Sequence, residues 1–347
     1  MRLTPLDPWL VERMGLSELR PEDVSAWQLR ELRATLAWAK AASPFHARRL
    51  ANVDPADLRG PDDLARLPRM TAADLATPGL LAVSQDGVAR VVSLRTSGSS
   101  GPPKRLLFTE ADLARTLEFF VVGMATLARQ GDTALVLLPS RRDLGVADLL
   151  SRALPHLGAR AVHPAEGWTP ADLPALISDQ GVSVLVAAPA QLRTLLDQAG
   201  TSSVCRACLR TVLSSGEPLS LGLRVQVESA WGCEVFDHWG MTESGYGGGV
   251  ECFAHSGYHL READLLVEVA DPATGRPLPP GQTGEILLTT LGPRALPLVR
   301  HQTGDAARWL LGPCPCGSAL RRLGPVQGRL GPGGAGVTQP AKGQGRP

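Results

Sequence analysis

The sequence has little of the features that would attract a macromolecular partner. Its 347 residues carry 35 basic and 34 acidic side chains, a formal net charge of +1, so no excess of charge favours nucleic acid or an anionic membrane. No apolar run approaches the roughly 20 residues that cross a bilayer. The first residues, MRLTPLDPWLVERMGL, lack the apolar stretch of a secretory signal. We therefore expect a cytoplasmic protein that binds neither nucleic acid nor membrane.

Cysteine and aromatic residues are also scarce. Six cysteines in a cytosolic chain of this length do not predict a disulfide framework, so metal binding or plain burial is favoured. Aromatic residues make up only 4% of the chain, but hydrophobic residues together reach 44%. That content is enough for a sizeable buried core in one large domain or two ordinary ones.

What is present is an alternation of strand-like and helix-like segments. Short apolar runs at 133–139, 159–164, 182–189 and 209–215 are separated by segments with helical periodicity. This order predicts an α/β fold with layered parallel or mixed sheets and flanking helices. Between about 250 and 325 short strands joined by Gly and Pro turns predict a small β-rich subdomain.

Two helices can be expected in the first third of the chain. Apolar residues recur at helical spacing from residue 23 to 50, and Ser43-Pro44 interrupts the run. Residues 110–129 follow Thr109, a residue type suited to a helix N-cap.

A small-residue loop lies between two apolar strands near residue 100. Glycines allow close backbone approach to a phosphate, consecutive N–H groups can form an anion-binding nest, and hydroxyls add donors. The alternative is a flexible Ser/Gly linker, but a Lys at the exit of the loop favours phosphate. The predicted phosphate-binding residues are Thr96, Ser97, Gly98, Ser99, Ser100 and Gly101, followed by Lys104.

The loop resembles the [ST]-S-G-[ST]-[ST]-G-x-P-K signature of the adenylate-forming superfamily, the AMP-dependent synthetases and ligases. Three further motifs match in order: Ser215-Gly216-Glu217-Pro218, then Asp237-His238-Trp239-Gly240-Met241-Thr242-Glu243, then Arg300-His301-Gln302-Thr303-Gly304-Asp305. The second resembles Y-G-x-T-E, with Trp239 in place of Tyr. The helix ending in Ala42-Ser43-Pro44-Phe45, and the run from Glu268 to Gly275, resemble the phenylacetate–CoA ligase branch.

The resemblance implies an acid–CoA ligase that uses Mg-ATP and CoA. It would convert a carboxylic acid, aromatic and phenylacetate-like, to acyl-AMP and then to acyl-CoA. The sequence leaves a homodimer open.

The same resemblance assigns roles to individual residues. Lys104, Thr242 and Glu243 would be catalytic, with Thr242 on the α-phosphate and Glu243 on Mg²⁺. The nucleotide would contact the 96–101 loop and Gly216, Glu217, Pro218, Asp237, Trp239, Asp305 and Arg329. Taken singly, Glu243 and Asp305 could be surface residues and Trp239 a core residue. The four motifs together favour the functional interpretation.

Four residues form a candidate structural zinc site. Cys252, His259, Cys314 and Cys316 offer three thiols and one imidazole, a closed tetrahedral set. Members of the phenylacetate–CoA ligase branch are similar in this respect. His255 competes with His259 as the nitrogen ligand, and Cys205-x-x-Cys208 is a rival half-site that we interpret as buried thiols.

The acyl pocket is expected between the 110–129 helix and the strands near 139 and 215. Helical spacing turns Phe119, Phe120, Gly123 and Met124 roughly that way, with core packing as the alternative for at least half of them. The sequence alone identifies no polar residue that would select the acid.

The end of the chain departs from the resemblance. Residues 1–327 match the superfamily's N-terminal core, and 328–347 read as a hinge remnant and mobile tail, without the C-terminal lid that brings a catalytic Lys. Gly331 stands where the hinge usually has Asp. Two alternatives follow: a catalytically impaired nucleotide-binding core, or a donor of acyl-adenylate to an amine or carrier protein.

Overall fold

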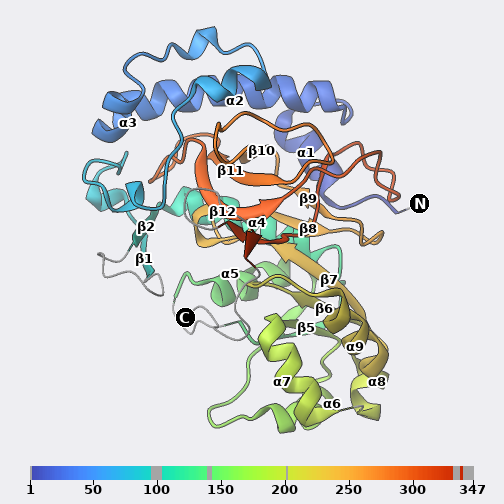
Figure 1. Ribbon diagram of the computed structural model, residues 1–347. Helices are drawn as coiled ribbons and strands as arrows, with labels where there is room; N and C mark the ends of the chain where they lie inside the picture. Colours follow the sequence, from blue (N-terminus) through green and yellow to red (C-terminus); the bar gives the residue numbers. More distant parts are fainter. Residues whose placement is uncertain (1, 95–103, 139–142, 201, 331–336, 339–347) are drawn as a thin grey trace.

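A computed structural model describes residues 2–94, 104–138, 143–200, 202–330 and 337–338 (Figure 1). Its α-helices are α1 (Leu6–Met14), α2 (Pro21–Ala42), α3 (Pro44–Arg49), α4 (Glu110–Met124), α5 (Val146–Ala153), α6 (Leu173–Gln180), α7 (Pro189–Ala199), α8 (Ser203–Cys208) and α9 (Leu221–Trp231). Its strands are β1 (Arg90–Leu94), β2 (Lys104–Phe108), β3 (Thr133–Val136), β4 (Arg160–Val162), β5 (Val184–Ala187), β6 (Thr211–Ser214), β7 (Glu234–Trp239), β8 (Gly249–Glu251), β9 (Tyr258–Leu260), β10 (Leu265–Ala270), β11 (Gly284–Thr290), β12 (His301–Ala307), β13 (Arg322–Leu323), β14 (Gly328–Leu330) and β15 (Val337–Thr338).

The largest sheet is mixed, with strand order β13-β9-β8-β7-β6-β5-β3-β4. Strands β3 to β7 pair in parallel, whereas β8, β9 and β13 continue the sheet in antiparallel fashion. This confirms the predicted α/β class with layered parallel and mixed sheets. It also shows that part of the 250–325 region shares a sheet with the parallel strands.

Both faces of β3, β5 and β6 and most of β7 are buried, and alternate residues of these strands belong to different cores. One core, which includes Leu135, Leu185, Val212 and Val235, packs under α6, α7, α8 and α9. The other, which includes Val136, Val186, Leu213 and Phe236, packs against α4 and α5. The near-continuous apolar runs noted in the sequence follow from this two-sided burial.

A second sheet, β10-β11-β12-β14-β15, is antiparallel, and α2 and α3 lie above it in Figure 1. The α2 side chain of Gln28 donates to the carbonyls of Glu262 and Leu265 at 2.9 and 3.2 Å, which fixes the helix beside β10. A third sheet is the two-stranded ribbon β1-β2.

Local sequence signals explain several boundaries. Thr109 caps α4 reciprocally with Asp112, as its residue type predicted. The predicted helical run breaks at Ser43, which caps α3 while Pro44 occupies its first turn. Within the described part of the chain, no helix has the length and hydropathy required to cross a membrane.

Candidate active site

Two of the predicted motifs lie side by side at the carboxyl edge of the parallel strands. The Ser215–Pro218 turn follows β6, and the Gly240–Glu243 segment follows β7. Because β6 and β7 are parallel neighbours, with Ser214 opposite Asp237, both turns emerge at one edge. This is where open α/β sheets bind ligands. Gly216 has φ +94° and open space where a Cβ would stand, so the turn presents bare backbone.

The β1-β2 ribbon brings Lys104 toward the same region. Lys104 opens β2, opposite Leu94 at the end of β1. The predicted phosphate loop is therefore flanked by two strands, as expected, and these strands pair with each other. The ribbon also contacts the segment after Glu243: the Tyr246 ring stacks on Phe108 at 5.5 Å, and its hydroxyl accepts from Arg90 Nε at 3.1 Å. Thr96, Ser97, Gly98, Ser99, Ser100 and Gly101 lie outside the described residues.

Glu243 and Lys104 both act on one buried imidazole. His301 begins β12 and is 1% exposed. Burial lowers its pKa to about 4, the Glu243 carboxylate partly opposes that shift, and the Lys104 ammonium adds to it. The two predicted catalytic charges therefore lie within electrostatic range of the same side chain. Thr242 and Glu243 are half-buried in a short 3₁₀ turn, Thr242–Ser244.

Asp305 and Arg329 form a pair across neighbouring strands. They face each other in the β12-β14 register, and Arg329 Nη1 donates to Asp305 Oδ1 at 2.8 Å. Arg329 Nη2 also donates to the Thr303 carbonyl at 2.8 Å. Gly304 has φ +73°, and a Cβ there would stand 2.8 Å from the guanidinium. The structure thus brings these two residues together, and the positive φ favours glycine between Thr303 and Asp305. Their contact with a nucleotide stays a prediction.

Asp237 lies within the protein interior, and its predicted contact with the nucleotide stays a prediction. Its carboxylate is buried: Oδ1 accepts from the His238 N–H at 3.0 Å and Oδ2 from the Tyr258 hydroxyl at 2.6 Å. Burial raises the pKa of Asp237 to about 7. Because side chains alternate along β7, Asp237 points to the face of the sheet opposite that of its neighbour His238.

Trp239 is also buried in this structure. Only 4% of the residue is exposed, and a Cβ at Gly248 would lie 2.5 Å from the indole ring. The ring therefore packs against the backbone of the following segment. Its predicted stacking on adenine stays a prediction.

An apolar pocket lies where the acyl group was expected. Four of its lining residues are the predicted α4 residues Phe119, Phe120, Gly123 and Met124. The remaining lining residues are Leu138, Val146, Leu150, Leu213, Ser215, His238, Tyr246 and Val250. Ser215 Oγ and His238 Nδ1 are 3.0 Å apart, and burial lowers the pKa of His238 to about 4. The sequence analysis missed this polar pair.

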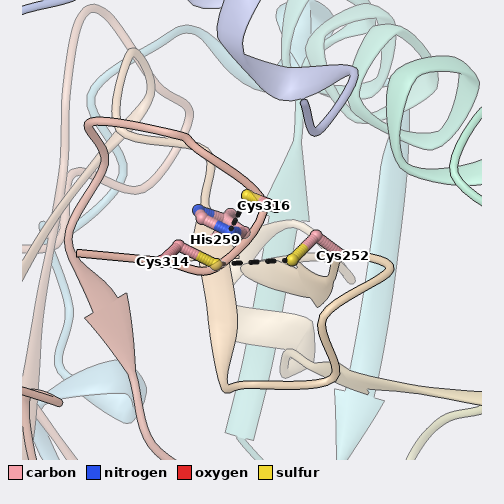
Figure 2. Close-up of side chains that lie close together, drawn as sticks. All are labelled: Cys252, His259, Cys314 and Cys316. Atoms are coloured by element: carbon pink, nitrogen blue, oxygen red, sulfur yellow. Dashed lines mark hydrogen bonds between the residues drawn. The ribbon is translucent and has the colours of Figure 1, made fainter. Parts of the chain in front are cut away.

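The predicted metal ligands gather on one side of the large sheet (Figure 2). Cys252 follows β8, His259 lies on β9, and Cys314 and Cys316 lie on the turn before β13. All four ligand atoms are within 4.8 Å of one another, and no residue of the four is more than 3% exposed. Cys252 Sγ lies 3.6 Å from Cys314 Sγ, and Cys316 Sγ lies 3.6 Å from His259 Nε2.

The alternative ligands lie elsewhere. His255 Nε2 hydrogen-bonds to Glu234 at 2.8 Å, and His255 Nδ1 lies 3.0 Å from Arg224, so its ring belongs to a charged network on the sheet. Cys205 is buried as predicted, but Cys208 is exposed. Neither belongs to the four-residue cluster.

Comparisons with known proteins agree with the geometry. A family model described as AMP-binding enzyme matches residues 85–292. A phenylacetate–coenzyme A ligase of Thermus thermophilus is 33% identical over 90% of this chain and 72% of its own length. Another phenylacetate–coenzyme A ligase, from Escherichia coli, is 28% identical over 94% of this chain and 74% of its own length.

Solved structures give the same fold. A 2-hydroxyisobutyryl-CoA ligase in complex with 2-HIB-AMP and CoA superposes with a TM-score of 0.80 at 24% identity, over 90% of this chain and 69% of that one. The sequence matches, and the turns gathered at the carboxyl edge of the sheet, lead to one conclusion: this chain belongs to the AMP-binding, adenylate-forming enzymes, in their phenylacetate–CoA ligase-like branch.

Proposed function

We propose that the protein is an AMP-forming acid–CoA ligase acting on a small aromatic acid. The carboxylate would attack the α-phosphorus of ATP, forming acyl-AMP and releasing pyrophosphate. The thiol of CoA would then displace AMP and lose its proton, giving the thioester. The observation that supports this most is the meeting of the two turns after β6 and β7 with an apolar pocket lined by α4.

The nucleotide would lie along the carboxyl edge of the sheet. The backbone of Gly216, with Glu217 and Pro218, would meet the adenine, and Asp305 would accept from the ribose hydroxyls. Arg329 holds one Asp305 oxygen at 2.8 Å, which orients the carboxylate before the ligand arrives. Lys104 and the preceding loop would neutralise the β- and γ-phosphates, and Thr242 would donate to the α-phosphate.

The Glu243 carboxylate is suited to hold Mg²⁺. It is half-buried, it lines a small cavity with β2, and it lies in electrostatic range of the buried His301. Hard cations take oxygen ligands and keep several waters, which one carboxylate permits. Bound there, the ion would offset the negative charge of the phosphate oxygens.

The cluster of Cys252, His259, Cys314 and Cys316 is suited to structural zinc. Zinc–sulfur bonds near 2.3 Å place neighbouring tetrahedral ligand atoms about 3.8 Å apart. The two contacts of 3.6 Å approach that spacing, and burial of all four residues leaves no open position for substrate. The site would therefore brace the fold rather than take part in the reaction. The proposed use of ATP and CoA supports a cytoplasmic location.

Acid-dependent exchange of labelled pyrophosphate into ATP tests the first half of this proposal. Exchange is expected with aromatic acids from a panel of phenylacetates and benzoates, and it should be lost in Glu243→Gln. Product analysis with CoA then tests the second half, because acyl-CoA is expected. If acyl-AMP reacts only with an amine or a carrier protein, that molecule, and not CoA, is the acceptor. ATP binding without exchange for any acid would refute the assignment.

A further inference from the structure

His238 places a polar ring on an otherwise apolar pocket wall. It follows Phe236 by two positions on β7, so both side chains point to the face of the sheet covered by α4. The ring lies beside Phe119, with centroids 6.5 Å apart. It also packs against backbone, because a Cβ at Gly240 would stand 2.8 Å from His238 Cε1. The imidazole is therefore held between α4 and the turn after β7.

One nitrogen of that ring is engaged by protein and the other is not. Nδ1 lies 3.0 Å from Ser215 Oγ, at the start of the turn after β6. Within the described part of the chain, Nε2 has no hydrogen-bond partner. The third polar residue of the pocket, Tyr246, has its hydroxyl bonded to Arg90 at 3.1 Å. The Ser215–His238 pair is thus the polar group that the pocket can offer to an acyl group.

The protonation state of the His238 ring limits which substituents of an acyl group it can bind. Burial lowers the pKa of His238 to about 4, so at neutral pH the imidazole carries no charge. A neutral imidazole has one donor and one acceptor nitrogen, and it does not attract a second anionic group. A hydroxyl substituent both donates and accepts, so it can pair with Nε2 in either tautomer. Once an acyl group fills the pocket and displaces water from this half-buried ring, an unsubstituted acid would leave Nε2 without a hydrogen-bond partner, which is costly.

We propose that His238, oriented by Ser215, is a specificity-determining residue that selects acids with a hydroxyl group on the acyl portion, such as hydroxylated arylacetates or benzoates. The assignment rests on the proposed function and narrows its substrate class.

Pyrophosphate exchange with matched acids tests the assignment. Each ring isomer of hydroxyphenylacetate is compared with the methyl-substituted isomer of the same position and with phenylacetate. In the wild-type protein at least one hydroxy isomer should exceed its methyl counterpart about 10- to 100-fold in kcat/KM, the range expected when a buried polar group is paired or left unpaired. His238→Leu should bring the ratio to about one or invert it, with the KM for ATP unchanged.

Three further variants separate selection from structure. His238→Asn keeps a hydrogen-bonding group and should restore part of the preference. Ser215→Ala should weaken it, and Met124→Leu, in the same pocket, should retain it. Equal kcat/KM values for the hydroxy and methyl isomers in the wild type would overturn the role of His238 but leave the proposed ligase function intact. The same holds for a His238→Leu variant that keeps the wild-type ratio of these two values. Exchange with no acid would overturn the proposed function and this assignment with it.

Discussion

Removing the charge of Glu268 should destabilise the protein far more than removing an exposed charge. Arg300 and Glu268 are 1% and 4% exposed, and the guanidinium donates to both carboxylate oxygens at 2.8 to 3.2 Å. Burial raises the pKa of Glu268 despite the cation beside it, so desolvation offsets much of what the pair contributes. The cost of breaking the pair is different, because the Arg300 charge would then be buried without its counterion.

Glu268→Gln keeps the volume of the side chain and one acceptor oxygen but strands the guanidinium. We expect a loss of about 3–5 kcal/mol in the free energy of unfolding. Domains of ordinary stability have about 5–15 kcal/mol in total. Because Arg300 directly precedes His301 in the strand that carries Asp305, the KM for ATP should rise as well.

Urea denaturation followed by tryptophan fluorescence measures this loss, since Trp231 is fully buried. Glu31→Gln is the matched control: its partner Arg30 is 63% exposed at the side chain, and removing such a pair costs no more than about 1 kcal/mol. Equal shifts of the denaturation midpoint in the two variants would refute the reasoning about the buried pair.

The remaining predictions concern pH, nucleotide and metal. Burial raises the pKa of Asp237 in the folded protein to about 7, so its contribution to stability is complete below the unfolded pKa and is lost as pH rises through 7. In the wild type the free energy of unfolding should therefore decline by at most about 1.4 kcal/mol per pH unit over this window. Asp237→Asn should remove that decline, so that the denaturation midpoints at pH 5 and pH 7.5 move closer together. Asp305→Asn should raise the KM for ATP about 10- to 100-fold, the range for a charge-assisted hydrogen bond, and Arg329→Gln should raise it less; equal effects would contradict the primary role of Asp305. Cys314→Ser should lose bound zinc, measured by elemental analysis, whereas the wild-type chain should hold one ion. Cys233 is buried but distant from the cluster, so Cys233→Ser should keep the zinc. Retention of zinc in Cys314→Ser would exclude this ligand set.

The layers of the fold could be predicted from the sequence because a strand buried on both faces is a continuous run of apolar residues. The apolar runs at β3, β5 and β6 alternate with helical periodicity, and Thr109 and Ser43 carry capping chemistry that acts locally. The pairing of β8 and β9 with the parallel sheet could not be predicted in this way. Which sheet a short strand joins depends on the edge it reaches in the fold, and the composition of the strand does not determine that edge.

Site residues could be predicted where they belong to a sequence motif. The direction in which each side chain points could not. The motif placed Asp237 and His238 together, but only the pleat of β7 shows that one faces Tyr258 and the other the pocket. Likewise, spacing favoured His259 as the nitrogen ligand but left His255 as a competitor. The structure separates them because His255 is held by Glu234, whereas His259 lies among the thiols.

The four-residue cysteine and histidine cluster has a consequence for the unfolded chain. Cys252 and Cys314 enclose roughly 60 residues, and the whole of β9 to β12, including Asp305, lies within that span. A metal bridging the two thiols would act as a reversible cross-link. By the relation for covalent loops, closing a span of this length removes about 4 kcal/mol of chain entropy from the denatured ensemble. Strand β12, which carries Asp305, would then owe part of its stability to an ion bound beside a different sheet, through an effect on unfolded states in which the strand is not formed.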